Sequence, residues 1–500
     1  CAARRFVLIS LFSAMVVPVY AARPAEKAKN VILMICDGAG FNAWQAASHY
    51  QHGRLCAEPF EDFPVHVGCT TYMLNYVDRQ GRALFADAGK VPRAAVGTQP
   101  QRYDPQRMWR DFNYAKGTNS YIAYTDSAAA CTALYTGSKT TRGRIAMNWN
   151  GKTELRTIAQ IADALGKSTG TISSVQVSHA TPGGVWAHNP NRENFGAIFK
   201  EMVYRSGLDV IMGAGHPLFG NGKAAAQSSA RTVSSVHFKY VGDKRAWDDL
   251  SDADGAGGFR LVQRKEDFEA MAAGSGPNGE PLPGRVVGLA QVHDTLQLGR
   301  DGRRMAPHDP KNDHVPALST MSKAALNVLA QDPEGFFLMV EGGAVDWANH
   351  QNNLERMIEE LTAFKEAIQA VADWVEANSS WDETLLIVTC DHECGMLWGA
   401  STYTDCNNNG QFDVGVDRFG SWQRIRSRGK GVLPGHQYGS GGHTTTLVPL
   451  WAIGAGSQRF ATLVDGVDRR AAAIWCFSGK YVDNTDVFAV MNAAMSPGAP

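Results

Sequence analysis

The sequence predicts an α/β fold with a large, mostly parallel central sheet, helices on both faces of the sheet and long inserted loops. Short continuous apolar runs, such as residues 31–35 and 336–340, are typical of buried parallel strands. Stretches with helical periodicity lie between these runs, which gives the alternation of strands and helices found in α/β domains. The 500 residues are 44% hydrophobic and 19% charged, so the chain can bury a sizeable core.

The expected elements follow one another along most of the chain. Strands are expected at VILMIC (31–36), GTISSVQV (170–177), LDVIMGAG (208–215), FFLMVEGG (336–343), LLIVTC (385–390) and LVPLWAIG (447–454). Helices are expected at residues 127–136, 157–166, 193–207, 319–332 and 352–378. The last of these is long and carries apolar residues at helical spacing, which indicates an amphipathic helix packed on the sheet.

Three segments interrupt this alternation, at about 76–110, 222–314 and 402–440. All three are rich in Gly, Asp, Asn and Pro and show little periodicity. Loops of this length inside a compact domain are usually functional decorations or peripheral subdomains. We therefore expect one large domain over residues 23–500 that carries three insertions.

Residues 1–22 are expected to form a secretory signal peptide. An arginine pair precedes an apolar run over 6–19, and residues 19–21 fit a cleavage site with small side chains. A membrane anchor is the alternative, but the run is short for a transmembrane helix. We therefore expect a periplasmic or secreted protein with no membrane anchor after cleavage. The net charge of −1 gives no basic footprint, so no nucleic-acid partner is expected.

Carboxylates stand at the ends of three expected strands, at Asp37, Glu341 and Asp391. Ligands of open α/β sheets bind just outside the carboxyl ends of such strands. Carboxylates gathered in a cleft repel one another and are costly to desolvate, and bound cations are the usual solution. His350 and His392 add the nitrogen ligands that Zn²⁺ favours. The pattern indicates a hydrolytic site with several metal ions.

Asp346 and His350 are four residues apart, which is about one helical turn, so both are expected on the same helix face. This spacing suits chelation of a metal ion, although such a pair can also be a surface interaction. His443 lies in a Gly-rich loop and has a rival in His436, seven residues earlier. The position of His443 directly before the run TTTLVPL favours it as the candidate ligand.

Ser127 stands where the helix 127–136 is expected to begin. An N-cap serine is the common structural interpretation of such a residue. The functional interpretation is a metal-activated nucleophile, because a helix N-terminus stabilises a negative oxygen and directs N–H groups at a phosphate. The local motif alone favours the cap.

Five segments, taken together, resemble those of bacterial alkaline phosphatases. They are DSAAACTALYTG (126–137), VSHATPGGVWAHNPNR (177–192), EGGAVDWANH (341–350), CDHECG (390–395) and GGHTTTLVPLWAIG (441–454). The resemblance extends from Asp37 to about Gly454, and five segments in the right order are highly specific. It implies an alkaline-phosphatase-like fold.

The resemblance also implies metal ligands, for two Zn²⁺ and one Mg²⁺. The ligands of the first Zn²⁺ would be Asp346, His350 and His443. Those of the second Zn²⁺ would be Asp37, Asp391, His392 and Ser127. Those of the Mg²⁺ would be Asp37, Thr181, Glu341 and, where an aspartate is often found in the family, His179.

Phosphate contacts follow from the same resemblance. Ser127 would accept the phosphoryl group, and Arg192 would grip two phosphate oxygens in a bidentate geometry that lysine does not reproduce. Trp347 stands in place of a basic residue that contacts phosphate through water. His179 and Trp347 are both similar to variants found in the marine cold-active and animal branches of the family.

The implied activity is hydrolysis of small-molecule phosphomonoesters at alkaline pH through a phosphoseryl intermediate, by a protein that the family suggests is a homodimer. A phosphodiesterase or another hydrolase of the superfamily is the first alternative. The diesterase branch usually has a threonine nucleophile, and sulfatases need a C/S-x-P-x-R segment that DSAAA lacks. A secreted metal- or phosphate-binding protein without turnover is the alternative from another class, and it would be expected to lack Ser127 or Arg192.

Residues 405–413 place oxygen-bearing side chains at alternate positions with glycine sixth, as calcium loops do. The candidate Ca²⁺ ligands are Asp405, Asn407, Asn409 and Asp413. The final glutamate of an EF-hand is missing, so an Asn/Gly-rich turn is an equally supported alternative.

The cysteines allow fewer conclusions. Cys36 and Cys390 stand at strand ends and are expected to be buried thiols. Cys394 is close to the metal-binding strand but is not counted among the expected ligands, because the carboxylates and histidines already suffice. Disulfide pairing does not follow from the sequence.

Overall fold

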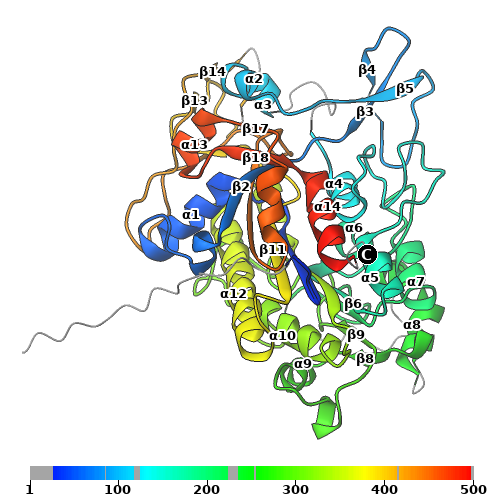
Figure 1. Cartoon of the computed structure of the whole chain (residues 1–500). Coiled ribbons are helices and arrows are strands. Elements are labelled where there is room, and N and C mark those ends of the chain that lie inside the picture. Colours follow the sequence, from blue (N-terminus) through cyan, green and yellow to red (C-terminus); the bar gives the residue numbers. More distant parts are fainter. Residues whose placement is uncertain are drawn as a thin grey trace, which may run out of the picture.

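The computed structural model describes residues 26–84, 86–116, 124–222, 235–252, 255–410, 412–413 and 416–496 (Figure 1). Within these residues an 11-stranded sheet forms the centre of the molecule. Its strands, in spatial order, are β17 (Gly466–Val467), β18 (Lys480–Asp483), β2 (Val65–Thr70), β16 (Val448–Gly454), β11 (Thr384–Thr389), β1 (Asn30–Cys36), β10 (Phe336–Gly342), β6 (Ser168–Gln176), β7 (Val210–Ala214), β9 (Val286–Leu289) and β8 (Arg260–Val262).

Most neighbouring strands of this sheet are parallel. The run from β11 through β1, β10, β6, β7 and β9 to β8 is parallel throughout. The exceptions are β16, which is antiparallel to both β11 and β2, and the short β17, which is antiparallel to β18. The predicted fold class is confirmed.

Helices cover both faces of the sheet. The helices of the described residues are α1 (Phe41–His52), α2 (Pro105–Arg110), α3 (Phe112–Lys116), α4 (Ser127–Thr136), α5 (Ile158–Ala164), α6 (Ala180–Gly183), α7 (Phe195–Tyr204), α8 (Lys244–Ser251), α9 (Lys265–Ala272), α10 (Leu318–Leu329), α11 (Ala344–His350), α12 (Leu354–Asn378), α13 (Arg469–Trp475) and α14 (Asn484–Met495). In Figure 1, α10 and α12 lie on one side of the central strands, and α4 and α14 lie on the other. The strands and helices expected from the sequence are all present, with shifts of a few residues at their ends.

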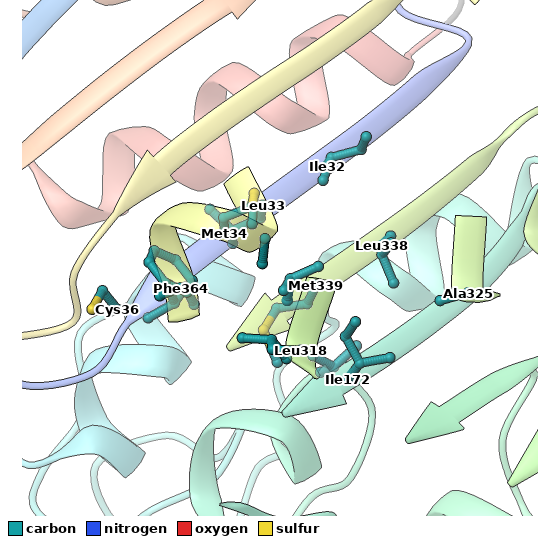
Figure 2. Close-up of a cluster of buried hydrophobic side chains, with 14 of the residues drawn as sticks. Ile32, Leu33, Met34, Cys36, Ile172, Leu318, Ala325, Leu338, Met339 and Phe364 are labelled. Atoms are coloured by element: carbon teal, nitrogen blue, oxygen red, sulfur yellow. The ribbon is translucent and has the colours of Figure 1, made fainter. Parts of the chain in front are cut away.

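Part of the main hydrophobic core lies where the central parallel strands meet α10 and α12. Leu33 of β1, Met339 of β10, Leu318 of α10 and Phe364 of α12 are all at most 3% exposed, and they lie together in Figure 2. Burying such a side chain contributes roughly 1.5–3 kcal/mol to folding. Because burial of these side chains stabilises the strands, the apolar runs that predicted the strands also hold the ends of the strands in place.

The segments expected as insertions differ in how far they leave the sheet. In 76–110, β3 (Leu74–Val77), β4 (Ala83–Leu84) and β5 (Gly97–Pro100) form a small sheet that projects from the body (Figure 1). In 402–440, β13 (Tyr403–Thr404) pairs with β14 (Arg418–Phe419), and β15 (Gln437–Tyr438) pairs with β12 (Leu397–Trp398). By contrast, 222–314 contributes β8 and β9 to one edge of the main sheet, so this segment is not wholly peripheral.

The proposed signal peptide at 1–22 lies outside the described residues. Within the described part of the chain, no helix combines the length and the apolar character needed to cross a bilayer. The eight cysteines from Cys36 to Cys476 are free thiols, and Cys36 and Cys390 are fully buried, as expected.

Candidate metal and phosphate site

The three strands expected to deliver carboxylates are adjacent in the sheet, with β1 between β11 and β10. Asp37 and Asp391 follow β1 and β11 directly, and Glu341 lies at the end of β10, opposite Ile35 of β1. All three carboxylates are buried, being at most 4% exposed. The prediction that these strands bring their acidic residues to one edge of one sheet is confirmed.

A first group of donor atoms surrounds Asp346. Asp346 lies on α11, which starts just after β10, and His350 at the end of this helix places Nε2 3.2 Å from Asp346 Oδ2. His443 Nε2 lies 3.4 Å from Asp346 Oδ1 and 3.1 Å from His350 Nε2. The structure thus places His443, not its rival His436, beside Asp346.

Backbone carbonyls orient both imidazoles of this group. His350 Nδ1 lies 2.7 Å from the carbonyl oxygen of Gly441, and His443 Nδ1 lies 2.8 Å from that of Thr125. Because a carbonyl oxygen only accepts, each Nδ1 donates, and in the neutral imidazoles both Nε2 atoms are acceptors directed at Asp346. Such hydrogen bonds to the far ring nitrogen are the usual support of metal-binding histidines.

A second group lies around His392. Its Nε2 atom is 3.1 Å from Asp391 Oδ2, 3.5 Å from Asp37 Oδ1 and 3.3 Å from the hydroxyl oxygen of Ser127. The other oxygen of Asp391 accepts hydrogen bonds from the amides of His392 and Gly38 at 2.9 and 3.1 Å. Asp391 therefore has one oxygen fixed by the backbone and one directed into the site.

Glu341 continues the acidic group on the β10 side. Its Oε2 atom accepts a short hydrogen bond from the Ser173 hydroxyl, while Oε1 is buried without a hydrogen bond. The hydroxyl of Thr181, which influences the pKa of Glu341, is likewise buried and unsatisfied. His179 instead stacks its ring on Phe195, with centroids 5.6 Å apart, and lies 5.5 Å from the Trp347 ring.

The donor groups fit metal cations on the chemistry of their atoms. Buried oxygens without a hydrogen bond converge here from Asp37, Glu341, Asp346, Asp391 and Thr181. An unsatisfied buried polar atom costs about 1–3 kcal/mol, and more when it is charged. Among the residues that the structure describes, two sets have donor atoms within 4.8 Å of one another, namely Asp37, Asp346 and His392, and Asp346, His350, Cys394 and His443. These residues can therefore hold cations at two neighbouring points.

The pKa values of these carboxyl groups also fit a site that binds cations. Burial, followed by the charge of Asp391, raises the pKa of Asp37 well above its ordinary value. Burial raises the pKa of Glu341 to about 7, and burial and Asp346 raise that of Asp391 to about 6. Burial opposes ionisation of Asp346 too, but His350 and His443 hold the pKa of that carboxyl well below its usual range. Positive charge within the site would relieve this repulsion.

Ser127 begins α4 but does not cap it. Asp126 is the N-cap, since its Oδ1 atom accepts a hydrogen bond from the amide of Ala129 at 3.1 Å. The interpretation of Ser127 as an N-cap serine is wrong, because the preceding aspartate already fills that role. The Ser127 hydroxyl is thereby free to face His392 at the positive end of the helix dipole.

Arg192 lies beside Ser127 through an ion pair with Asp126. Its NH1 atom is 3.0 Å from Asp126 Oδ2. Burial raises the pKa of Asp126, but the charge of Arg192 and then that of Arg142 outweigh it and lower the pKa below its ordinary value. The carboxylate stays ionised and orients the guanidinium.

A cavity of about 370 Å³ opens over these groups. Ser127, Arg192 and the Asp346 group form part of its wall. The rest is lined by Ala88, Tyr124, Asp126, Arg142, His179, Glu193, Phe195, Trp347 and Gly442. Trp347 lines the cavity, and its role near bound phosphate stays a prediction.

A family model for alkaline phosphatase matches residues 103–429, more than half of the chain. The chain belongs to the alkaline phosphatase family. It is accordingly a phosphatase, a hydrolase with a metal-binding site.

Individual relatives agree with this family. The chain is 28% identical to alkaline phosphatase 3 of Bacillus subtilis over 302 residues, which are 59% of this chain and 54% of that relative. It is 26% identical to the alkaline phosphatase of Escherichia coli over 390 residues, or 73% and 70% of the two chains. The alkaline phosphatase of the Antarctic bacterium TAB5 shares the fold, with a TM-score of 0.55, 20% identity, and coverage of 94% of this chain and 99% of that one.

Sequence reasoning missed three features of this phosphatase site. Asp126 was only a neighbour of Ser127, although an aspartate directly before a helix is a signal for an N-cap. Phe195 carried no signal that placed it at the cavity, and Cys394 was set aside despite its position close to the metal-binding strand. All three act through contacts between segments that are distant in the sequence.

The proposed calcium loop forms a hydrogen-bonded turn. The carboxylate of Asp405 accepts hydrogen bonds from the amides of Asn409 and Gly410, at 3.3 and 2.7 Å. Asp413 accepts from the side-chain amides of Asn407 and Asn409, at 2.7 and 2.6 Å. The described residues of the loop thus satisfy one another, and Ca²⁺ binding stays a prediction.

Proposed function

We propose that the protein hydrolyses phosphate monoesters at alkaline pH through a phosphoseryl intermediate on Ser127. The observation that carries this proposal is the position of the Ser127 hydroxyl. It lies at the N-terminus of α4, 3.3 Å from His392 Nε2, on the wall of the same cavity as Arg192. The proposed nucleophile, the proposed cation ligands and the proposed phosphate clamp lie close together, which supports the proposal.

In this proposal Ser127 Oγ gives up its proton to solvent and attacks phosphorus, while the bond from phosphorus to the ester oxygen breaks on the opposite side. The departing alkoxide takes a proton from solvent and leaves as the alcohol. Arg192 binds two of the phosphoryl oxygens, and the amides at the start of α4 face the developing negative charge. Asp126 keeps the guanidinium in place through the 3.0 Å ion pair. Water then attacks the phosphoserine, which releases inorganic phosphate and restores the hydroxyl.

The cations are proposed as two Zn²⁺ and one Mg²⁺. Asp346, His350 and His443 would hold the first Zn²⁺. Asp37, Asp391, His392 and Ser127 would hold the second. Asp37, Thr181 and Glu341, with His179 nearby, would hold the Mg²⁺. When bound, they supply the positive charge that lowers the pKa of a serine hydroxyl and polarises phosphoryl oxygens.

An alkaline optimum follows from the donor set. Histidine ligands bind metal only when neutral, so acid releases the cations by protonating them. We further propose that the protein works in the periplasm or outside the cell, on the basis of the arginine pair and apolar run within residues 1–22. The proposed substrates are small phosphomonoesters, because the groups gathered here would contact the phosphate and make few contacts with the alcohol.

The test compares p-nitrophenyl phosphate with bis(p-nitrophenyl) phosphate and p-nitrophenyl sulfate. The proposal expects fast hydrolysis of the monoester alone, loss of activity after chelation, and recovery on addition of Zn²⁺ but not of Mg²⁺ alone. Preference for the diester would establish the phosphodiesterase alternative. Tight phosphate binding without hydrolysis of any of the three would establish a binding protein.

A further inference from the structure

The thiol of Cys394 lies among the proposed ligands of the first Zn²⁺. Its sulfur atom and the donor atoms of Asp346, His350 and His443 are all within 4.8 Å of one another. The residue is fully buried. Asp346 Oδ1, in turn, is buried with no hydrogen bond.

Backbone contacts fix Cys394 in this position. Its amide donates to the carbonyl oxygen of Gly38 at 3.1 Å, and the residue pairs with His443 in an antiparallel bridge. The next amide, of Gly395, donates to the Gly442 carbonyl at 2.9 Å. The segment is therefore attached on one side to the turn after Asp37 and on the other to the loop that carries His443.

Close packing leaves little freedom at this point. Gly38 has a φ of +73°, and a Cβ added there would lie 2.6 Å from the Asp346 Cα atom. The neighbouring Glu393 is turned away, because its carboxylate accepts from the Leu397 amide at 3.1 Å and the Thr444 hydroxyl at 2.5 Å. Of Glu393 and Cys394, it is Cys394 whose donor atom lies close to that of Asp346.

Other buried thiols near the site have different surroundings. The Cys131 thiol donates to the carbonyl oxygens of Ala128 and Ala180 at 3.2 and 3.5 Å. Cys390 accepts from Trp44 Nε1 at 3.4 Å. Neither belongs to the groups of converging donor atoms found among the described residues. The position of Cys394 is therefore not a general property of buried cysteines in this fold.

We propose that Cys394 is a fourth protein ligand of the metal held by Asp346, His350 and His443. This inference rests on the metal assignment in the proposed function. Thiolate, imidazole and carboxylate together are a donor set typical of Zn²⁺, whereas Mg²⁺ takes oxygen ligands. Binding transfers the thiol proton to solvent, since a coordinating thiol is deprotonated. Zn²⁺ also accepts a fifth ligand, so four protein donors do not exclude an oxygen of the substrate.

The test uses the full chain, stripped of metal and reloaded with Co²⁺. Sulfur bound to Co²⁺ gives an intense charge-transfer band in the near ultraviolet, which nitrogen and oxygen ligands do not give. We expect this band in the wild type and in Cys131→Ser, whose hydroxyl can keep the two carbonyl contacts. We expect it to be absent in Cys394→Ser, with a loss of Zn²⁺ affinity at this site of at least about 10-fold, since even loss of a residue that supports a ligand costs about 10–100-fold.

A wild-type Co²⁺ spectrum without the band would overturn the proposal, even if Cys394→Ser does not fold. A band that persists unchanged in Cys394→Ser would overturn it as well. The phosphatase assay on the wild type separates this proposal from the proposed function. Monoester hydrolysis without the sulfur band would reject only Cys394 as a metal ligand. The band without any hydrolysis would reject only the proposed phosphomonoesterase activity.

Discussion

Asp126 and Arg192 form a 3.0 Å ion pair immediately beside Ser127. The same aspartate caps α4, through a 3.1 Å hydrogen bond from the Ala129 amide. Both of its oxygens also accept from the Gly143 amide, each at 3.1 Å. One carboxylate thus fixes the helix that presents the proposed nucleophile and the guanidinium that would hold phosphate.

The substitution Asp126→Asn tests this double role. Asparagine is as good an N-cap as aspartate, so the melting temperature should change little. The charge that orients Arg192 is lost, however, and a hydrogen bond to a charged group is worth about 1.5–3 kcal/mol. We expect kcat/KM for p-nitrophenyl phosphate to fall roughly 10–100-fold and inhibition by inorganic phosphate to weaken. An unchanged phosphate inhibition constant would show that Arg192 is held by other contacts.

Trp347 offers a second test, because its side chain lines the cavity beside His179. Trp347→Lys adds a positive charge near bound phosphate, so inhibition by inorganic phosphate should tighten and turnover should slow if product release limits it. Trp347→Phe, which changes the ring but not the charge, is the matched control. Equal inhibition constants for the lysine and phenylalanine variants would mean that position 347 does not contact the phosphate environment.

His66 predicts a pH dependence of stability away from the metal site. Its ring stacks on Trp451 with centroids 5.1 Å apart, and burial lowers its pKa to about 4. The unfolded state, with a pKa of about 6.5, binds the proton first as pH falls. The free energy of unfolding therefore decreases from about pH 6.5 towards pH 4, by at most about 1.4 kcal/mol per pH unit from this group.

His66→Phe keeps the ring contact and removes the titration, so urea unfolding should depend less on pH over this interval.

His188 affects the pH dependence of stability in the opposite direction, because Glu201, at 3.0 Å, raises the pKa of His188 against the effect of burial. Its contribution is present below about pH 6.5 and is lost as pH rises through the raised value, so His188→Gln should weaken the protein mainly in acid. If both variants shift stability equally at every pH, these histidines do not titrate as described.

The loop at 405–413 provides a fourth prediction. If it binds Ca²⁺, millimolar Ca²⁺ should raise the melting temperature and protect the 402–440 segment from proteolysis. Asp405→Ala combined with Asp413→Ala should abolish the protection while leaving the Zn²⁺ content unchanged. If Ca²⁺ protects the double mutant and the wild type equally, the loop is a hydrogen-bonded turn that does not bind Ca²⁺.

The sequence was sufficient to predict the sheet and the acidic groups at its edge. The apolar runs before Asp37, Glu341 and Asp391 are long enough to define buried strands, and the carboxyl ends of parallel strands must share one edge. Periodicity likewise placed Asp346 and His350 on one helix face, where their side chains are 3.2 Å apart.

Contacts between loops could not be predicted in the same way. The pairing of Asp126 with Arg192 and of Cys394 with His443 depends on how irregular segments pack, which leaves no periodic signal. The loop-rich segment 222–314 was also misleading, because its strands β8 and β9 are too short to stand out from the surrounding turns. Nor did composition indicate that the ring of His179 stacks on that of Phe195.

The most direct test of the central proposal is to trap the enzyme with labelled phosphate at low pH and to map the labelled residue. The account predicts a stable phosphoserine at Ser127 in the wild type, and no label in Ser127→Ala that retains its metal content. Label on any other residue, or full activity of Ser127→Ala, would contradict it.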